Sequence, residues 1–300
     1  MSQTHASTPP ATSPPGKVIS TSPAVTDILC ALGAADLLVG RSAACDHPGA
    51  ARVPVVETLA AQEHEFAAAA GALRAGLVFV GDATVPNPAQ ASASIRVVQI
   101  APRTIEGIWD AILTVGREVD RAQQATDLVV ALRERFFAAN EFVNPYDDGP
   151  ITVFLESIDP LICSGDWISQ LVERAGAIHA LNPTTPKPHT GIASGPQFAE
   201  RTAGRAVRVP IEVLTALNPP RVILCPKDGT LDTAAEWAAN LSTHDWWRSL
   251  RAVRTGGVAL VAGTATFHRP GPGIVDAYEW LVAWLHNLPT PSRIPWRCLD

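Results

Sequence analysis

The chain alternates short apolar segments with amphipathic segments that end at a glycine, and this alternation restricts the fold more than any other feature. The stretch "VISTSPAVTDILCALG" at 18–33 starts with an apolar run, followed by Ser22, which can cap a helix, and Pro23, which suits a first helical turn. The stretch "VFLESIDPLICSGDWISQLVERAG" at 153–176 repeats the order of strand, loop, helix and glycine. Strands that alternate with helices are typical of parallel α/β units, so the sequence predicts an α/β fold with two lobes and mostly parallel sheets.

The segment between the two lobes has a helical pattern. Apolar residues recur at spacings of three, four and seven between Ile105 and Phe136, and no proline interrupts 104–143. One helix of about 40 residues would be roughly 60 Å long, and two helices joined at a slight bend would fit the same pattern. The expected domains are a disordered tail at 1–16, an N-terminal lobe at 17–103, the long helix at 104–143, a C-terminal lobe at 150–288 and a C-terminal tail at 289–300.

Composition excludes several classes of protein. Hydrophobic residues make up 47% of the chain and charged residues 17%, which allows a core and argues against disorder. The net charge of −6 and the lack of a basic run exclude a typical nucleic-acid binder. No window approaches the roughly 18 apolar residues of a membrane span. Because "MSQTHASTPPATSPPG" lacks the apolar core of a secretory signal, we expect a soluble, cytoplasmic protein, with a targeting role of the tail left open.

Motifs of catalysis are absent from the sequence. It contains no GxSxG elbow, no P-loop and no GxGxxG after a strand, and its carboxylates do not form an obvious acid–base pair. The five cysteines are odd in number and include no CxxC pair, so neither a zinc site nor a disulfide framework is expected. We therefore expect a binding protein and not an enzyme.

Open α/β sheets bind ligands at the carboxyl ends of their strands, which points to the loops that follow the predicted strands. These loops are 20–23, 42–48, 81–88, 157–167, 225–230 and 263–271.

Several stretches, taken in order, resemble the helical-backbone substrate-binding proteins (class III, periplasmic-binding-protein-like), and among them the signal-less members of the vitamin B12-binding group. They are "VISTSPAVTDILCALGAADLLVGRSAACDHP", "PRTIEGIWDAILTVG", "DPLICSGDWISQLVERAGA", "ALNPPRVILCP" and "FHRPGPGIVDAYEWLVAWLH", which together run from about residue 17 to 287. The resemblance implies two Rossmann-like lobes bridged by one long backbone helix. It also implies a cobalamin-like corrinoid held in the cleft between the lobes by a carrier, store or sensor. Another metal chelate, such as haem or a siderophore, and a ligand-free interaction module remain as alternatives.

The resemblance bears on partners as well. Members of the family that dock on an ABC permease carry one glutamate on each lobe, and those positions correspond to Ala68 and Glu212 here. Because one of the two carboxylates and a signal peptide are missing, we do not expect docking on a permease. Insertion into a membrane is not expected either, since no apolar window is long enough to span one. The expected partner is the small-molecule chelate itself.

The ligand-binding residues that the resemblance implies in the first lobe are Ser22, Pro23, Cys45, Asp46 and His47. The alternative for the "CDHP" loop is an ordinary surface turn, because Asp and Pro favour turns. Two aromatic positions typical of relatives are occupied by Ala44 and Ile211, which reduces the expected stacking surface.

In the second lobe the implied ligand-binding residues are Asp166, Trp167, Phe267, His268 and Arg269. Each has a structural alternative: Asp166 as a helix cap, Trp167 as a core residue over the helix end, Phe267 as core and Arg269 as a partner of a carboxylate. The eight histidines show no HxH or HxxxH spacing, and His47 with His268 is the candidate metal pair.

Overall fold

The computed structural model describes residues 16–56, 63–82, 95–144, 146, 149–187, 201–263 and 266–299. The chain forms two compact units. Unit 1 contains Met1–Ala101 and Leu113–Asp127, and unit 2 contains Pro102–Ile112 and Leu128–Asp300. The tail predicted at 1–16 lies, except for Gly16, outside the described residues, as does most of the predicted loop at 81–88.

Among the described residues, unit 1 is built on a sheet of four parallel strands in the order β2-β1-β3-β4. The strands are β1 (Lys17–Ser20), β2 (Leu38–Arg41), β3 (Ala75–Val80) and β4 (Arg96–Gln99). Val18 and Ile19 point to opposite faces of β1, and both are fully buried. Strands covered on both faces are typical of a parallel sheet between helices.

The first helix of unit 1 confirms the start and stop signals of the sequence. α1 covers Pro23–Ala31, and the Ser22 hydroxyl at its N-cap accepts a hydrogen bond from the Val25 amide at 3.5 Å. Gly33 ends the helix with a φ of 67°, in the left-handed region that favours glycine. The remaining helical segments of this lobe are η1 (Ala35–Leu37), η2 (Pro48–Ala50) and α2 (Glu63–Ala72).

Residues 105–140 form two helices where the sequence predicted one long helix or a slightly bent pair. α3 covers Ile105–Glu118 and α4 covers Ala122–Asn140. Between them, Asp120 has a φ of 57°, and the Arg121 amide donates to the Gly116 carbonyl at 2.7 Å. The left-handed Asp120 ends α3, since a right-handed helix cannot continue through that conformation.

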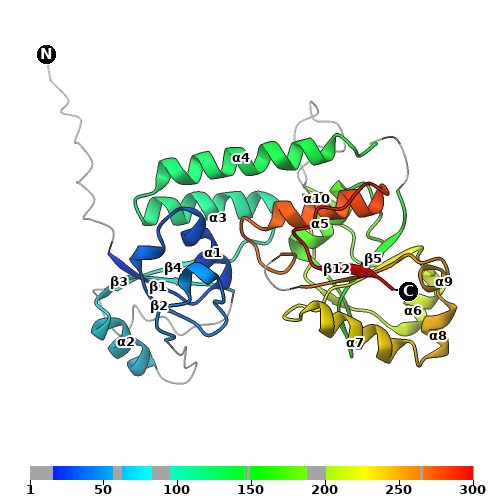
Figure 1. The fold of residues 1–300 in the computed structure, drawn as a ribbon, viewed down its shortest axis with the longest axis horizontal. Helices are drawn as coiled ribbons and strands as arrows, with labels where there is room; N and C mark the ends of the chain where they lie inside the picture. Colours follow the sequence, from blue (N-terminus) through cyan, green and yellow to red (C-terminus); the bar gives the residue numbers. More distant parts are fainter. Residues whose placement is uncertain are drawn as a thin grey trace, which may run out of the picture. The chain divides into compact units, whose positions relative to one another are not determined.

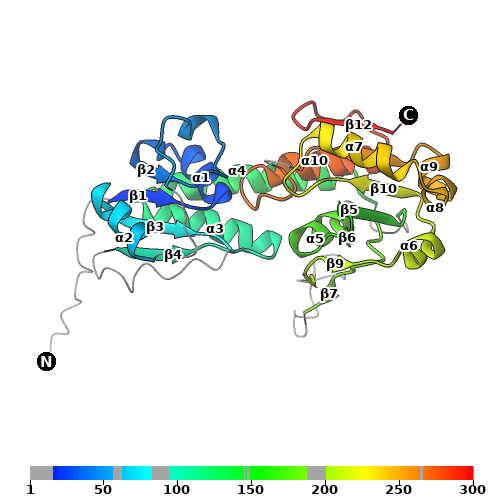
Figure 2. The same ribbon diagram turned by 90° about the horizontal axis from the view of Figure 1, so that it is seen from below.

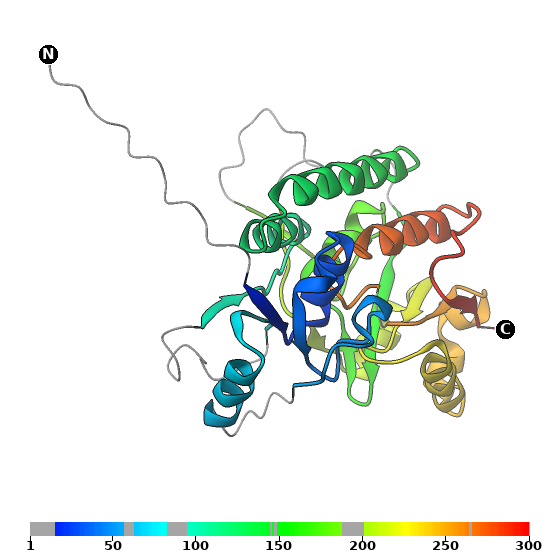
Figure 3. The ribbon, with the colours of Figure 1, turned by 60° about the vertical axis from the view of Figure 1, so that its left-hand side comes forward.

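The two helices then lie side by side with opposite directions (Figures 1 and 3). The ring centroids of Trp109 in α3 and Phe136 in α4 are 6.3 Å apart. One continuous helix would hold the same rings roughly 40 Å apart at its rise of 1.5 Å per residue. The prediction of a single long strut is therefore wrong, because apolar spacing does not reveal a reversal made by the polar residues Asp120 and Arg121.

Unit 2 contains, among its described residues, a six-stranded sheet in the order β12-β11-β10-β5-β6-β9. Figure 2 shows β5 between β10 and β6. The pairs β5–β10 and β10–β11 are parallel, and the outer pairs β5–β6, β6–β9 and β11–β12 are antiparallel. The bounds are β5 (Thr152–Ile158), β6 (Leu161–Cys163), β9 (Val207–Arg208), β10 (Arg221–Leu224), β11 (Val258–Val261) and β12 (Trp296–Cys298), and a separate pair is formed by β7 (Thr185–Pro186) and β8 (Arg201–Thr202).

Helices cover both faces of this sheet (Figure 1). Val153 and Leu155 of β5 pack in one core cluster with α6 (Ile211–Leu217), α7 (Leu231–Leu241), α8 (Asp245–Ser249) and α9 (Arg251–Arg254). Phe154 points to the other face, where α5 (Asp166–Arg174) and α10 (Ile274–Leu285) lie. The predicted α/β class with two lobes and mostly parallel pairing is confirmed.

The sequence predicted only a tail at 289–300, but this segment also contains a strand. Within it, Trp296–Cys298 form β12, which pairs with β11 with Val261 opposite Trp296. No helix among the described residues is both long and apolar enough to cross a bilayer.

Candidate ligand-binding site

The carboxyl ends of the parallel strands of unit 2 carry a group of polar side chains. β10 runs parallel to β5, and β11 runs parallel to β10. The residues that follow these strands therefore reach the same edge of the sheet. We call this group the carboxyl-edge cluster, and it consists of Glu156, Ser164, Asp166, Lys227, Asp228 and His268.

Glu156 is the centre of the cluster. The Ser164 hydroxyl donates to Glu156 Oε2 at 3.0 Å, and the side chain is only 14% exposed. Burial raises the pKa of the Glu156 carboxyl, the Ser164 bond and Lys227 lower it, and Asp166 and Asp228 raise it. In the contact with Ser164 the Glu156 carboxylate is the acceptor.

His268 is a buried member of the cluster, with 6% of its side chain exposed. Its Nε2 lies 3.0 Å from the Cys225 carbonyl oxygen, which only accepts, so this nitrogen carries the proton. Burial is the main cause that lowers the pKa of His268 to about 4, and the imidazole is therefore neutral near pH 7. Its remaining lone pair, on Nδ1, is 3.9 Å from Glu156 Oε2.

Trp167 is half-buried and firmly oriented. Its indole N–H donates to the Phe267 carbonyl oxygen at 2.7 Å. Phe267 itself is fully buried, with its ring 5.0 Å from that of Phe154 and 5.7 Å from that of Trp280, measured between centroids. The expectation that Phe267 offers a ring face to a ligand is thus corrected: the ring belongs to the core, and the residue contributes a backbone carbonyl that holds Trp167.

Asp166 begins α5 but does not cap it. The N-cap is Gly165, and a side chain there would overlap the Gly204 carbonyl, which accepts from the Asp166 amide at 2.8 Å. Asp166 has a φ of 54°, and its carboxylate forms an ion pair with Arg103. The capping alternative is therefore wrong in detail, although an acidic first turn still suits the helix dipole. Arg269 is half-buried, and its role toward a ligand stays a prediction.

In unit 1, the loop after β2 packs against the end of β1. Cys45 is buried, with its sulfur 3.2 Å from Ser42 Oγ and 3.6 Å from the Ser20 carbonyl oxygen. Ser22 is buried at its N-cap, with Pro23 directly after it in the first turn of α1. Cys45 thus anchors the loop to the end of β1, whereas Ser22 makes its hydrogen bonds at the start of α1.

Asp46 and His47 form the outer part of this loop. Asp46 is exposed, and His47 is half-buried with Nδ1 accepting from the Gly49 amide at 3.0 Å. This bond leaves the proton of a neutral His47 on Nε2. His47 and His268 lie in different units, and their use as a metal pair stays a prediction; the Gly49 amide already occupies the Nδ1 lone pair of His47, whereas the Nδ1 lone pair of His268 is not used by the Cys225 bond. Among the described residues, no three His, Cys, Asp or Glu side chains form a group that could hold a metal.

Three site residues were missed at the level of the sequence. Arg41 ends β2, and its guanidinium donates to the carbonyls of Cys45 at 2.7 Å and Ala50 at 3.1 Å, which organises the 42–53 loop. Glu156 and Arg103 were missed too. An acidic residue that ends the apolar run "TVFLE" was a readable signal for Glu156, whereas nothing local marks Arg103 as the partner of Asp166.

A buried Cys–His contact in unit 2 has the residue types of a nucleophilic dyad but not the chemistry. Cys163 Sγ lies 3.4 Å from His179 Nε2, and both residues are fully buried. Burial raises the pKa of the Cys163 thiol to about 12 and lowers the pKa of His179. Neither the thiolate nor the imidazolium is favoured, so the pair is structural.

Two α/β units with an α-helical segment between them in the chain are the architecture of substrate-binding proteins. The chain belongs to the periplasmic binding protein family, a family of solute-binding proteins, whose sequence model matches residues 18–263. This confirms the resemblance to the helical-backbone substrate-binding proteins. No curated protein sequence matches the chain.

Solved structures of similar fold include binding proteins for three kinds of chelate. A periplasmic heme binding protein from Pseudomonas aeruginosa is 20% identical, with a TM-score of 0.67 and coverage of 95% of this chain and 95% of that chain. The periplasmic vitamin B12 binding protein BtuF of Vibrio cholerae is 20% identical, with a TM-score of 0.62 and coverage of 90% and 97%. An ABC-type Fe3+-hydroxamate transport system protein from Saccharomonospora viridis is 21% identical, with a TM-score of 0.63 and coverage of 90% and 93%. At these identities the likeness shows the fold.

Proposed function

We propose that this protein binds a metal chelate, with a cobalamin-like corrinoid as the first candidate, and serves as a carrier, store or sensor. The observation that carries the proposal is Trp167, whose indole is fixed by the Phe267 carbonyl at 2.7 Å beside the carboxyl-edge cluster. The fold supports it, because similar structures bind vitamin B12, heme or Fe3+-hydroxamate.

The chemistry of the cluster suits a flat ligand with a polar rim. A pre-oriented indole offers a large apolar face at low entropic cost. Lys227 and Asp228 are exposed, and Glu156 is a carboxyl with a raised pKa, so amide or carboxylate groups of a rim would meet both donors and acceptors.

Haem or a hydroxamate siderophore is the alternative ligand class, and the same cluster could serve it. The burial of Phe267 removes one expected ring face, which favours the ligand-free alternative to that extent. An intracellular location is also part of the proposal. A contact of the Asp46–His47 loop of unit 1 with the ligand stays a prediction. Fractionation of cells followed by immunoblotting tests the location.

Titration calorimetry with cyanocobalamin, haemin and ferrioxamine B tests the function, with co-elution of the coloured ligand on a sizing column as the second readout. Trp167→Ala should weaken the ligand that binds by roughly 10- to 100-fold, or about 1–3 kcal/mol. Trp246→Ala is the matched control, since Trp246 is also half-buried but lies in α8, on the other face of the sheet. Absence of binding for all three chelates would refute the proposal, and equal losses in both variants would refute the role of Trp167.

A further inference from the structure

Unit 2 contains a concavity at the amino ends of its parallel strands, at the edge of the sheet opposite the carboxyl-edge cluster. Pro150 and Ile151 come just before β5, and Pro220 and Arg221 stand at the start of β10. The cavity has a volume of about 560 Å³, within the range of about 300–1,000 Å³ that small-molecule pockets occupy. Nothing in the proposed chelate site uses this edge of the sheet.

The wall of this amino-edge pocket is apolar on one side and cationic on the other. Pro150, Ile151, Leu217 and Pro220 supply the apolar part, and Arg221 and Arg251 supply two guanidinium groups. No carboxylate of the described residues pairs with either arginine, and no acidic residue lines the cavity. Two guanidinium groups without a carboxylate partner among the described residues make the pocket more favourable for an anion than for a cation.

Three of the four polar side chains that line the pocket, those of Asn218, Thr255 and Arg221, have partners within the protein, whereas Arg251 contributes only its backbone groups to these contacts. Asn218 has a φ of 46° at the end of α6, and its Oδ1 accepts from the Arg251 amide at 2.7 Å. Because the atom that accepts this bond must be the oxygen of the Asn218 side chain, the other terminal atom is Nδ2, which remains available as a donor. The Thr255 hydroxyl donates to the Arg251 carbonyl at 2.9 Å, and the Arg221 guanidinium lies 5.4 Å from the centre of the Trp284 ring.

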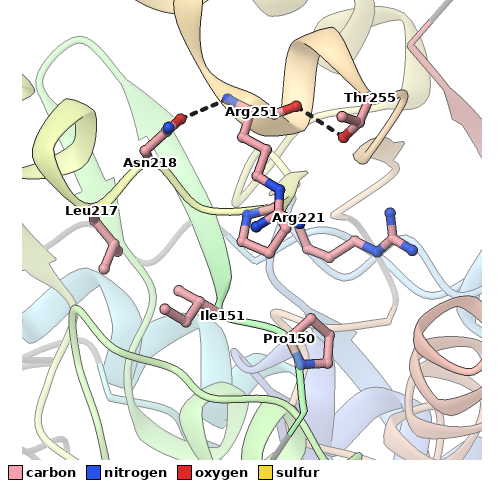
Figure 4. A pocket seen from close by; sticks show the side chains of 8 residues that line it. Pro150, Ile151, Leu217, Asn218, Arg221, Arg251 and Thr255 are labelled. Atoms are coloured by element: carbon pink, nitrogen blue, oxygen red, sulfur yellow. Dashed lines mark hydrogen bonds between the residues drawn. The ribbon is translucent and has the colours of Figure 1, made fainter.

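Figure 4 shows how these side chains lie. The Arg251 side chain extends from α9 toward Pro150 and Ile151, while Leu217 and the Arg221 guanidinium stand on opposite sides of the view. The side-chain groups that a ligand can meet are therefore the guanidinium and amide donors, set beside an apolar surface. Such a set matches a ligand with an anionic head and an apolar body.

We propose that the amino-edge pocket is a second binding site, specific for a small amphipathic anion such as a medium-chain carboxylate. Arg251 and Asn218 Nδ2 bind the head group, and the proline, isoleucine and leucine side chains contact the apolar body. The site is independent of the chelate site, because it uses other loops at the other edge of the sheet.

Titration of the full chain with octanoate, followed by calorimetry or ligand-observed NMR, tests this site. Two further probes separate its parts: 1-octanol has the apolar body without the charge, and inorganic phosphate has the charge without the body. Octanoate should bind at least about tenfold more tightly than either probe. Arg251→Gln should weaken octanoate by about tenfold or more, and raised salt should weaken it too.

Arg254→Gln is the matched control, because Arg254 is an exposed arginine of the same helix that does not line the pocket. Equal octanoate affinity in Arg251→Gln and the wild type, binding of 1-octanol as tight as octanoate, or no octanoate binding would each overturn the proposal. Trp167→Ala should leave octanoate affinity unchanged, so failure of the chelate proposal and failure of this one are told apart.

Discussion

The Nδ1 of His268 lies 3.9 Å from Glu156 Oε2, while the Nε2 of the same imidazole is bound to the Cys225 carbonyl at 3.0 Å. One ring thus contacts the ends of two neighbouring parallel strands, β5 and β10. Because the ring is buried and neutral, this contact makes the stability of unit 2 depend on pH.

Acidification should destabilise the protein through His268. Its pKa is about 4 in the folded state against an ordinary value of 6.5, so below pH 6.5 the unfolded chain binds a proton that the folded chain does not. The unfolding free energy should fall between pH 6.5 and 4, by at most about 3 kcal/mol at 1.36 kcal/mol per pKa unit. His268→Gln keeps an N–H donor but cannot titrate, and urea unfolding at several pH values should show a smaller loss for it. Parallel pH profiles for wild type and variant would contradict this.

The helical reversal makes Gly116 intolerant of a side chain. A Cβ at Gly116 would overlap the Cβ of Ala125 in α4. Gly116→Ala should therefore destabilise unit 1 by about 1–3 kcal/mol, through a forced separation of the helices. Gly71→Ala is the control, since Gly71 is also helical but has nothing within 4 Å of that position, and it should be neutral or stabilising by up to about 1 kcal/mol. Thermal unfolding of both variants decides, and equal effects would argue against the close contact.

The stability of unit 2 should depend on the paired hydrogen bonds that the Arg135 guanidinium of α4 donates. Its Nε donates to Glu279 Oε1 at 2.9 Å and its Nη2 to Glu279 Oε2 at 2.7 Å, with Asp276 as a further partner, and all three side chains are partly buried. Lysine cannot reproduce this two-pronged geometry. Arg135→Lys should cost about 1 kcal/mol in urea unfolding, whereas Arg293→Lys, at a 60% exposed arginine that also pairs with Asp276, should cost less. A larger loss of unfolding free energy for Arg293→Lys than for Arg135→Lys would refute the importance of the paired Arg135–Glu279 bonds.

The cysteines should differ in reactivity. Burial raises the pKa of the Cys163 and Cys225 thiols, and both side chains are fully buried. Cys298 in β12 is exposed. Iodoacetamide at pH 8 should label Cys298 in the native protein and reach Cys163 and Cys225 only after unfolding. Mass spectrometry of digested samples identifies the labelled positions, and rapid native labelling of Cys163 would contradict its burial.

Local signals predicted the elements whose causes are local. The helix start at Ser22 and Pro23 and the stop at Gly33 follow from capping chemistry, and the structure places all three as expected. The reversal at Asp120 could not be read in this way, since its residues are common in helices and the apolar pattern continues on both sides. β12 was missed for a related reason: the short polar segment around Arg297 pairs only because β11 offers an open edge.

The candidate site was predicted only in part. Trp167 was implied by the family resemblance, and in the structure its indole N–H donates to the Phe267 carbonyl oxygen at the carboxyl edge. Phe267 was assigned to the ligand by the family resemblance, with a core role as the alternative, and its ring lies in the core against Phe154 and Trp280. No spacing rule relates positions so far apart in the chain, so the core role was visible only in three dimensions.

The amino-acid sequence alone determined the α/β class and the two-lobed plan, because hydrophobic period, caps and turn residues act within a few positions, and the resemblance of its ordered motifs to known proteins indicated the family. Tertiary structure alone decided the turn between α3 and α4, the pairing of Asp166 with Arg103, the burial of Phe267 and His268, and the cationic pocket at the amino edge. Those features depend on contacts between residues that are far apart in the chain, either in the apolar core or between charged side chains. Such contacts form only when the chain folds.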